Sequence, residues 1–251
     1  DASVDTATYI GIFKLDKLRK LIIPDSPLFN RKEKQNCEIT KYRKTRSDNL
    51  FCKHFNSSSV RLFHSLEILN MGGINDCHKS SIFGCEHQSQ CVFPKHTVLR
   101  ELYLAHICIS RMDMHISGLN LLEKFDFSSN QCEYISSLAF SEMFSLTTLL
   151  LNGNSLSTME ETDPDELRIL FRNNSKLRRL NLSANGFTRL HSDMFKMNKK
   201  LEHLYLSGNF LHNTDWLSST LEHLRSLDLK GNRLTTIDSR TRHVVDNFGC
   251  G

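Results

Sequence analysis

Three absences narrow the function of this 251-residue sequence before any motif is considered. No stretch approaches about 18 consecutive apolar residues, so no segment is expected to cross a membrane as a helix. The start of the chain lacks the basic and apolar regions of a signal peptide, so we expect either a removed signal or a piece of a longer protein. No G-x-S-x-G, H-E-x-x-H or phosphate-binding loop occurs, which argues against an enzyme and gives no reason to expect a cofactor or a metal.

The composition is that of a globular protein with one local excess of charge. Hydrophobic residues make up 39% and charged residues 24%, so we expect neither disorder nor a membrane domain. The net charge of +4 arises in residues 31–53, which hold eight basic and three acidic residues. Clustered Lys and Arg attract phosphates, so this stretch is a candidate polyanion contact through Lys41, Arg43, Lys44 and Arg46. A solvated surface loop is the simpler interpretation of the same residues.

The second half of the chain repeats one template, L-x-x-L-x-L-x-x-N-x-L, at intervals of 23 to 31 residues. Six copies begin at Leu99, Leu122, Leu146, Leu177, Leu201 and Leu224. In five of them the asparagine is in register, at Asn130, Asn154, Asn185, Asn209 and Asn232. Five asparagines in register do not occur by accident, so the chain is predicted to be a repeat protein. Weaker copies begin at Leu18 and Leu66.

This template is that of a leucine-rich repeat, and it predicts an α/β solenoid shaped like a horseshoe. Each L-x-L is expected to form a short parallel strand on the concave face, with its leucines inward and the x residues outward. Loops and short helices are expected on the convex side. The asparagine is expected to bond the backbone of neighbouring turns, because a buried polar group without a partner is costly. A single turn buries too few side chains to fold alone, so the repeats must stack.

The solenoid is expected to be one continuous body that changes character near residue 99. Residues 1–98 hold irregular repeats with cysteine-bearing insertions. Residues 99–251 hold regular repeats, and they end without the cap that closes a solenoid. We therefore expect this sequence to be cut from something longer.

Departures from the template predict how the convex side packs. Asp163 followed by Pro164 marks the start of a helix. This helix is expected to cover the core with Leu167, Leu170 and Phe171. A second helix is expected over residues 236–248. Aromatic residues 18 positions after the first leucine of a repeat are predicted to stack in a spine, namely Phe140 and Phe195, with Trp216 in the same role.

Five of the eight cysteines fall in the irregular part and are candidates for disulfide bonds that staple its loops: Cys37, Cys52, Cys77, Cys85 and Cys91. His78, His87 and His96 lie among these cysteines, so a zinc site is the alternative. The spacings of the cysteines do not match a C-x-x-C pair. Cys132 takes a leucine position of the template, and Cys108 lies close to the same place one turn earlier. Both are expected to be small core residues.

Three N-x-S/T sequons, at Asn56, Asn173 and Asn181, are candidate glycosylation sites. Together with the cysteines they favour a secreted protein or an ectodomain. Asn181 is the x of an L-x-L, so a glycan there would project from the concave face and obstruct it. In that case ligand binding is expected at a flank, on the convex side or in the insertions.

The repeats resemble the C-terminal part of a Toll-like receptor ectodomain over residues 60–250. Irregular repeats with cysteine-bearing insertions, followed by regular turns, are similar to that family. The ending L-D-L-K-G-N-R-L-T-T-I-D at residues 227–238, then Thr241-Arg242, is similar to its last repeat before the C-terminal cap. The family's cap, membrane helix and signalling domain have no counterpart here. The resemblance implies an extracellular or endosomal-lumenal module of a membrane-anchored receptor, which recognises microbial or damage ligands and forms homo- or heterodimers.

Other interpretations stay open. An adhesion or matrix protein with leucine-rich repeats, or a repeat-type antigen receptor without a signalling domain, would use the same template. Those proteins tend to have regular repeats, so the long insertions here count against them. Nucleic acid is a candidate ligand through the basic stretch but is not favoured, and the sequence does not indicate which protein or microbial ligand is bound.

Overall fold

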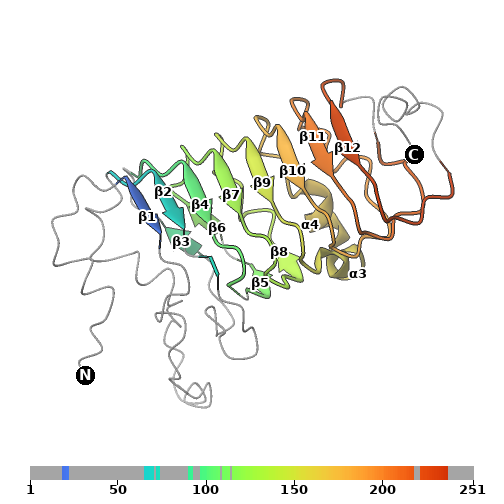
Figure 1. Cartoon of the computed structure of the whole chain (residues 1–251), viewed down its shortest axis with the longest axis horizontal. Helices are drawn as coiled ribbons and strands as arrows, with labels where there is room; N and C mark the ends of the chain where they lie inside the picture. The colour runs from blue at the N-terminus through green and yellow to red at the C-terminus, as the bar shows by residue number, and fades with distance from the viewer. Residues whose placement is uncertain are drawn as a thin grey trace, which may run out of the picture.

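The computed structural model describes residues 19–22, 65–70, 72–73, 90–92, 97–107, 109–113, 115–217 and 221–236. Within them, eight strands form one sheet in chain order (Figure 1). They are β1 (Lys20–Ile22), β2 (Ile68–Asn70), β4 (Glu101–Tyr103), β7 (Lys124–Asp126), β9 (Thr148–Leu150), β10 (Arg179–Asn181), β11 (His203–Tyr205) and β12 (Ser226–Asp228). All neighbours are parallel and in register on the central residue, as when Leu180 faces Leu149 and Leu204. The predicted leucine-rich-repeat solenoid is confirmed.

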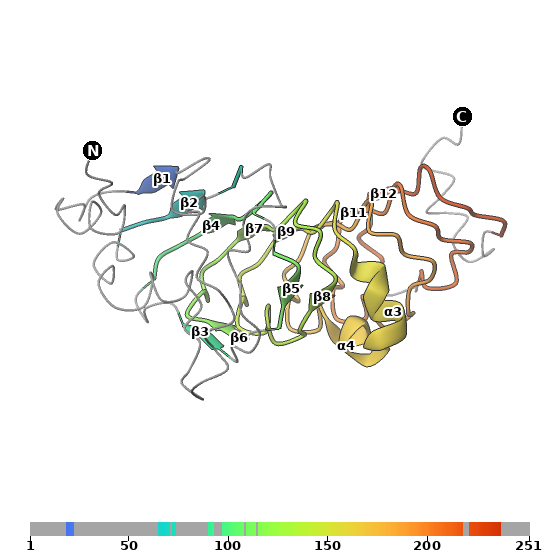
Figure 2. The ribbon, with the colours of Figure 1, turned by 90° about the horizontal axis from the view of Figure 1, so that it is seen from below.

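Smaller elements lie on the other side of the solenoid from this main sheet (Figure 2). Two pairs of short parallel strands form there: β3 (Gln90–Val92) with β6 (His115–Ser117), and β5 (Arg111–Met112) with β8 (Tyr134–Ile135). A helical insertion follows β9 and comprises η3 (Leu156–Thr158), α3 (Met159–Thr162) and α4 (Pro164–Ile169). No helix in the described residues is long and apolar enough to cross a membrane.

Helix α4 confirms the helix predicted after Asp163. It begins at Pro164 with Asp163 at the N-cap position, although the Asp163 side chain makes no capping hydrogen bond. Leu167, and Leu170 and Phe171 in the turn that follows, are buried against the core as expected. Helix α3 was not predicted, because four residues are too few for a helical period to show. Residues 237–248 of the second expected helix lie outside the described residues.

An aromatic spine runs through the interior behind the main sheet. Ring centroids lie 6.5 Å apart between Phe140 and Phe171, 6.3 Å between Phe171 and Phe195, and 5.9 Å between Phe195 and Trp216. These spacings are those of packed aromatic pairs. The predicted stacking of Phe140, Phe195 and Trp216 is confirmed, and Phe171 joins them. Because each ring comes from a different repeat, the spine joins four successive turns of the solenoid.

The template asparagines are buried and their side chains join neighbouring repeats. In Asn154, Oδ1 accepts from the backbone N–H of Asn130 (3.0 Å) and of Cys132 (2.9 Å) in the preceding repeat. Its Nδ2 donates to the carbonyls of Phe127 and Leu151, one in each repeat. Equivalent hydrogen bonds are made by Asn130, Asn185, Asn209 and Asn232. Each amide therefore pairs backbone groups that the tight turn would otherwise leave buried without partners.

Two further buried asparagines, Asn174 and Asn198, each lie three residues before the first leucine of a repeat. Asn174 Nδ2 donates to the carbonyl of Phe140 (3.0 Å), and Asn198 Nδ2 donates to the carbonyls of Phe171 (3.0 Å) and Asn174 (2.9 Å). Nothing in the template calls for asparagine there, so neither residue was predicted. Asn174 thus holds its segment against residues 140–143, and Asn198 holds its segment against residues 171–174.

Two carboxylates fasten the helical insertion to the repeats on either side of it. Glu160 is 7% exposed and accepts from the backbone N–H groups of Thr188 (2.8 Å) and Arg189 (3.2 Å) in the next repeat. Glu166 accepts from the backbone N–H of Ser137 (2.7 Å) in the preceding repeat. Hydrogen bonds from N–H groups to a charged acceptor are stronger than neutral ones, so the insertion is held as a fixed part of the solenoid.

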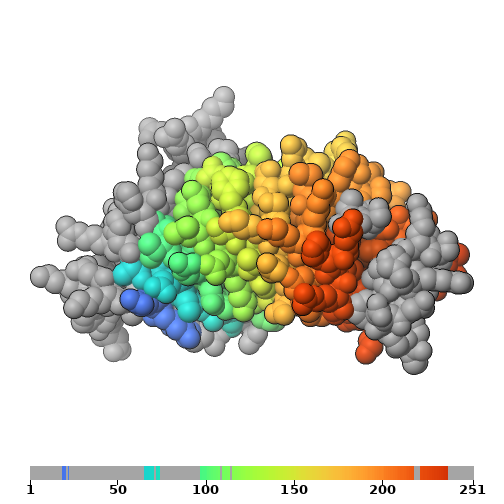
Figure 3. All heavy atoms as spheres, turned by 90° about the horizontal axis from the view of Figure 1, so that it is seen from above, coloured from blue at the N-terminus to red at the C-terminus, as the bar shows by residue number. Residues whose placement is uncertain are grey.

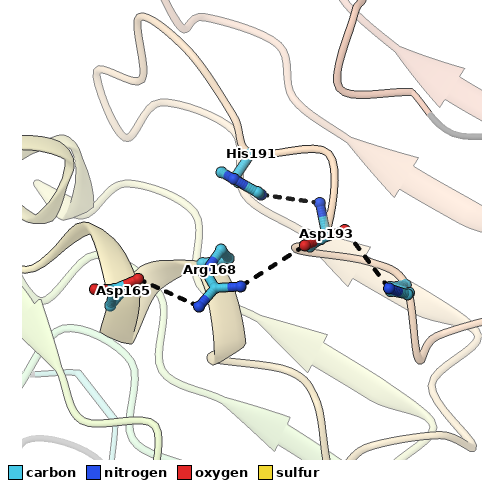
Figure 4. Close-up of polar contacts among 5 residues, drawn as sticks. Asp165, Arg168, His191 and Asp193 are labelled. Atoms are coloured by element: carbon cyan, nitrogen blue, oxygen red, sulfur yellow. Dashed lines mark hydrogen bonds and ion pairs between the residues drawn. The ribbon is translucent and has the colours of Figure 1, made fainter.

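An ion-pair cluster extends this attachment on the surface (Figure 4). Arg168 of α4 lies 3.3 Å from Asp165 and 3.7 Å from Asp193 of the next repeat. The backbone N–H of Asp193 donates to His191 Nδ1 (3.0 Å), and Lys196 lies 4.0 Å from Asp193. Exposed ion pairs of this kind contribute at most about 1 kcal/mol each, so the buried carboxylate of Glu160 is the main attachment.

Candidate ligand-recognition surface

The outward side chains of the main sheet form a continuous surface, here called the outer sheet face. They come from the first and third residues of each strand, because the central residue points into the core. In register, they make two rows. One row is Lys20, Ile68, Glu101, Lys124, Thr148, Arg179, His203 and Ser226, and the other is Ile22, Asn70, Tyr103, Asp126, Leu150, Asn181, Tyr205 and Asp228.

A row of alternating charge, here called the rim row, borders this face where the strands begin. Its residues each follow the first leucine of a repeat: Arg19, Glu67, Arg100, Glu123, Thr147, Arg178, Glu202 and Arg225. Arg19 lies 3.6 Å from Glu67, and Arg225 lies 4.0 Å from Glu202. Arg100 pairs with Glu123, and Arg178 pairs with Glu202. The rim row thus neutralises itself between neighbouring repeats.

The best-defined of these pairs also shifts a pKa. The Arg178 guanidinium donates to the Glu202 carboxylate and holds the pKa of that carboxyl below its usual value. The charge of Arg225 acts in the same direction. This row was not predicted, although the alternation of charge is visible in the sequence at the position after the first leucine of each repeat.

Four of the eight side chains in the second row form a turn with their own backbone where the strand ends. Oδ1 of Asn70, Asp126, Asn181 and Asp228 accepts from the backbone N–H two residues further on, at 3.0 to 3.1 Å. This is the local turn that Asn and Asp form with their own backbone. These four side chains therefore have a structural role that their outward position alone does not reveal.

Three other outward side chains, those of Glu101, Tyr103 and Lys124, contact one another. The Tyr103 hydroxyl donates to Glu101 (2.5 Å), and the Lys124 ammonium lies 4.8 Å from the centre of the Tyr103 ring. Burial raises the pKa of Tyr103, and the hydrogen bond to Glu101 raises it further. The phenol therefore stays protonated at neutral pH and holds the two charged side chains together.

Among the outward side chains that remain, five are neighbours on β9, β10 and β11, and these are here called the central group: Thr148, Leu150, Arg179, His203 and Tyr205. Arg179 lies between Thr148 and His203 in the register and is exposed. Among the described residues it has no acidic side chain within ion-pair distance, in contrast to the arginines of the rim row. The central group offers one cation, one aromatic ring and one apolar side chain to a partner.

The predicted site residues fall into two sets. Most of them lie outside the described residues: Asn56, Lys41, Arg43, Lys44, Arg46, Cys37, Cys52, Cys77 and Cys85. Cys108 and the three histidines of the zinc alternative lie outside them too, and the Cys91 side chain is not described. Asn173 and Asn181 are described, the first exposed and the second half-buried. The sequon predictions stay predictions. No cluster of His, Cys, Asp or Glu suited to a metal ion occurs in the part of the chain that the structure describes.

Cys132 takes the core position that the template gave it. It is fully buried and unpaired, and its Sγ lies 3.1 Å from the carbonyl of Tyr134. Burial raises the pKa of the Cys132 thiol to about 12. A thiol this hard to ionise packs as a small apolar side chain and is a poor nucleophile.

Comparisons with known proteins agree with the fold. Sequence models described as "Leucine rich repeat" and "Leucine Rich repeats (2 copies)" match residues 169–211 and 199–241. No curated protein sequence matches the chain. The chain is similar to the crystal structure of human 5T4 (Wnt-activated inhibitory factor 1, trophoblast glycoprotein), with 26% identity over 59% of this chain and 56% of that one and a TM-score of 0.49.

A second similar structure is that of a TLR13–ssRNA13 complex. It shares 22% identity over 78% of this chain and 29% of that one, with a TM-score of 0.51. At this identity the likeness supports the leucine-rich-repeat fold and nothing finer. The chain spans about half of the 5T4 chain and under a third of the TLR13 chain that it matches.

Proposed function

We propose that this chain is the ligand-recognition module of a receptor of the Toll-like kind, without catalytic activity, in the extracellular or endosomal-lumenal space. The full-length protein is then membrane-anchored, senses a microbial or damage ligand and dimerises to signal. The observation that supports the proposal is the central group, five neighbouring outward side chains that make no hydrogen bond or ion pair with any described residue.

The make-up of the central group is suited to a protein or mixed polar–apolar ligand. Tyrosine and arginine are the residue types over-represented among the side chains that dominate binding energy. Arg179 and Tyr205 project from strands fixed by buried leucines on both sides, so little side-chain order is lost when a ligand binds. Leu150 adds an apolar contact beside them in the register.

RNA is one ligand class to be tested, because the TLR13 structure is a complex with ssRNA. The outer sheet face gives it limited support. In the rim row Arg100 and Arg178 face carboxylates, and on the sheet face Lys124 lies against an aromatic ring, which leaves few charges for a phosphate backbone. A protein or microbial ligand therefore remains the favoured partner.

Asn181 decides between two placements of the ligand. Its Oδ1 is used by the Ser183 N–H, and its neighbours in the register are Leu150 and Tyr205. A glycan on Nδ2 would keep that hydrogen bond and cover the central group. If mass spectrometry of the secreted protein finds Asn181 glycosylated, binding must occur at an edge or in the insertions instead.

The test is binding of the chain to immobilised lipopeptide, lipopolysaccharide, flagellin and single-stranded RNA. We expect Arg179→Ala to weaken binding of the recognised ligand by at least about tenfold, the effect of losing a hot-spot residue. Lys230→Ala, an exposed change two repeats away, is the matched control and should leave the affinity unchanged. Equal affinities of both variants would remove the central group from the ligand site, and no binding to any class would refute the receptor proposal.

A membrane helix and a signalling domain in the full gene product would separate this proposal from its alternative. That alternative is an adhesion or matrix protein with leucine-rich repeats, or a repeat-type antigen receptor, without a signalling domain.

A further inference from the structure

One surface of the solenoid carries acidic side chains at one end and basic side chains at the other. The acidic end belongs to the helical insertion, and its exposed or half-buried members are here called the acidic half: Glu161, Asp163 and Asp165. The basic end belongs to the segments that lead into β10 and β11, and its exposed members are here called the basic half: Arg172, Lys176, Lys199 and Lys200. Among the described residues no acidic side chain lies within ion-pair distance of the basic half, so its positive charge is not neutralised by this part of the chain.

A chain of ion pairs joins the two halves, so they lie side by side (Figure 4). Arg168 lies 3.3 Å from Asp165 and 3.7 Å from Asp193 of the next repeat. Asp193 in turn lies 4.0 Å from Lys196, beside the basic half. Figure 3 shows the yellow and orange bands of this part of the chain adjoining one another. The surface therefore has one boundary, at which its charge changes sign.

The packing beneath this surface holds both halves in place. Glu160 and Glu166 fasten the insertion to the repeats on either side of it through backbone N–H groups. Under the basic half, the Phe171 and Phe195 rings stack 6.3 Å apart, and Asn198 Nδ2 donates to the Phe171 carbonyl at 3.0 Å. Like charges held close together repel each other, so each half is stabilised by a surface of the opposite charge.

The most exposed large hydrophobic side chains of the described residues lie on the same surface. They are Leu138, which is 56% exposed, and Phe144 and Met197, which are 52% exposed each. Leu138 adjoins the insertion, because the N–H of the preceding residue donates to Glu166. Phe144 adjoins the basic half, because the carbonyl of the preceding residue accepts from Asn174, and Met197 lies within the basic half. Apolar side chains among charged ones are the make-up of a protein interface.

We propose that this surface pairs with the same surface of a second copy about a two-fold axis. The axis lies in the interface along the boundary between the halves, so the acidic half of each copy faces the basic half of the other. The same operation brings Leu138, beside the acidic half, towards Phe144 of the other copy, beside the basic half. Both charge contacts form at once, so association closes at a dimer. This contact deepens the proposed function and rests on it, because it specifies the surface through which copies of the receptor dimerise.

The contact sets a condition on Asn173, the exposed sequon asparagine next to Arg172. A glycan on Asn173 would cover the basic half and keep a second copy away from it. We therefore expect mass spectrometry of the secreted protein to find Asn173 unmodified. A glycan at this position would overturn the proposal.

The experiment is sedimentation velocity of the chain over a range of concentrations, in about 0.03 M and about 0.5 M salt. At low salt we expect the average sedimentation coefficient to rise with concentration and to level off at the dimer value. At high salt the screening length falls below about 8 Å, so the dimer should dissociate. A monomer under both conditions, a dimer that salt leaves unchanged, or growth beyond two copies would overturn the proposal.

Two variants test the pairing of the halves directly. Lys199→Glu with Lys200→Glu cancels the charge of the basic half, and Glu161→Lys with Asp165→Lys reverses that of the acidic half. Each variant alone should dimerise at least about tenfold more weakly, because both of its contacts lose their attraction. Mixed in equal amounts, the two should form a heterodimer, because the intact acidic half of the first faces the intact basic half of the second. Variants that dimerise like the wild type, or a mixture that stays monomeric, would refute the contact.

Two controls separate this contact from net charge and from ligand binding. Lys20→Glu with Lys230→Glu makes the same change of charge at two exposed lysines outside this surface and should dimerise like the wild type. Weakened dimerisation of this control would mean that net charge, and not this surface, drives association. Arg179→Ala should also dimerise like the wild type, because the central group lies on the outer sheet face. Since ligand does not enter the measurement, the proposed function and this contact can fail separately.

Discussion

Asn209 is fully buried, and its side chain pairs four backbone groups of two repeats. Oδ1 accepts from the N–H groups of Asn185 and Phe187, and Nδ2 donates to the carbonyls of Leu182 and Leu206. Asn209→Leu keeps the branched arrangement of heavy atoms, although its methyl groups are larger, and leaves these four groups unpaired. Since each buried unpaired group costs about 1–3 kcal/mol, we expect the free energy of unfolding to fall by at least about 3 kcal/mol in urea denaturation.

The control for this change is Asn120→Leu. Asn120 is exposed, so its substitution should alter the free energy of unfolding by no more than about 0.5 kcal/mol. If both variants lose equal stability, the hydrogen bonds of the template asparagine are not what holds the turn.

Glu202 gives the rim row a dependence on pH. Its carboxyl pKa is lower in the folded chain than in the unfolded one because Arg178 stabilises the charged form. A depressed folded pKa contributes stability that is present above the unfolded pKa, about 4.3, and is lost as pH falls through the folded pKa. We therefore expect Glu202→Gln to lower the Tm at pH 7, and this difference to shrink as the pH falls below the unfolded pKa and through the folded one.

Thermal unfolding of both proteins across this pH range is the measurement. A difference in Tm that does not shrink as the pH falls below the unfolded pKa would mean that Glu202 acts through packing rather than through its charge. Glu222→Gln, an exposed carboxylate with no ion-pair partner among the described residues, is the matched control.

Among the structural elements, the aromatic spine sets how the repeats stack. Phe171 is fully buried between Phe140 and Phe195, whereas Phe144, from the preceding repeat, is 52% exposed. Phe171→Ala should lower the free energy of unfolding by about 3–5 kcal/mol, because it opens a cavity in the spine. Phe144→Ala makes the same chemical change at the surface and should cost less than about 1 kcal/mol. Urea denaturation of the two variants tests this, and similar losses would mean that the spine does not stabilise the stack.

The regular part of the fold was predictable because its signal repeats. Each leucine of the template is buried for the same reason in every turn, so six copies reinforce one interpretation that a single copy would leave open. The spine was found for the same reason, from the spacing of Phe140 and Phe195. Helix α4 was found because Asp163 and Pro164 mark its start chemically rather than by period.

The candidate surface was less predictable, since exposure does not reveal what a side chain does. Asn181 and Asp228 occupy outward positions but end their strands, and Lys124 occupies one but lies against Tyr103. Only the contacts separate these from Arg179. Glu160 and Asn198 were missed because their partners are backbone groups about one repeat away, and such partners leave no pattern in the sequence.

For the whole molecule, the order of strands in the main sheet implies that a disturbance should weaken with distance along the solenoid. Each strand pairs only with its neighbours in the chain of repeats, so stability is a sum of contributions from repeats and their interfaces.

Leu180→Ala creates a cavity under β10, and in hydrogen exchange we expect the largest loss of protection in β9, β10 and β11. The loss should be smaller in β12 and smaller still in β4, three strands away in the sheet. Ser192→Ala, an exposed change in the same repeat, should leave exchange unaltered. An equal loss in every strand would show that the solenoid opens only as a single cooperative unit, and the description of independent nearest-neighbour contacts would have to be abandoned.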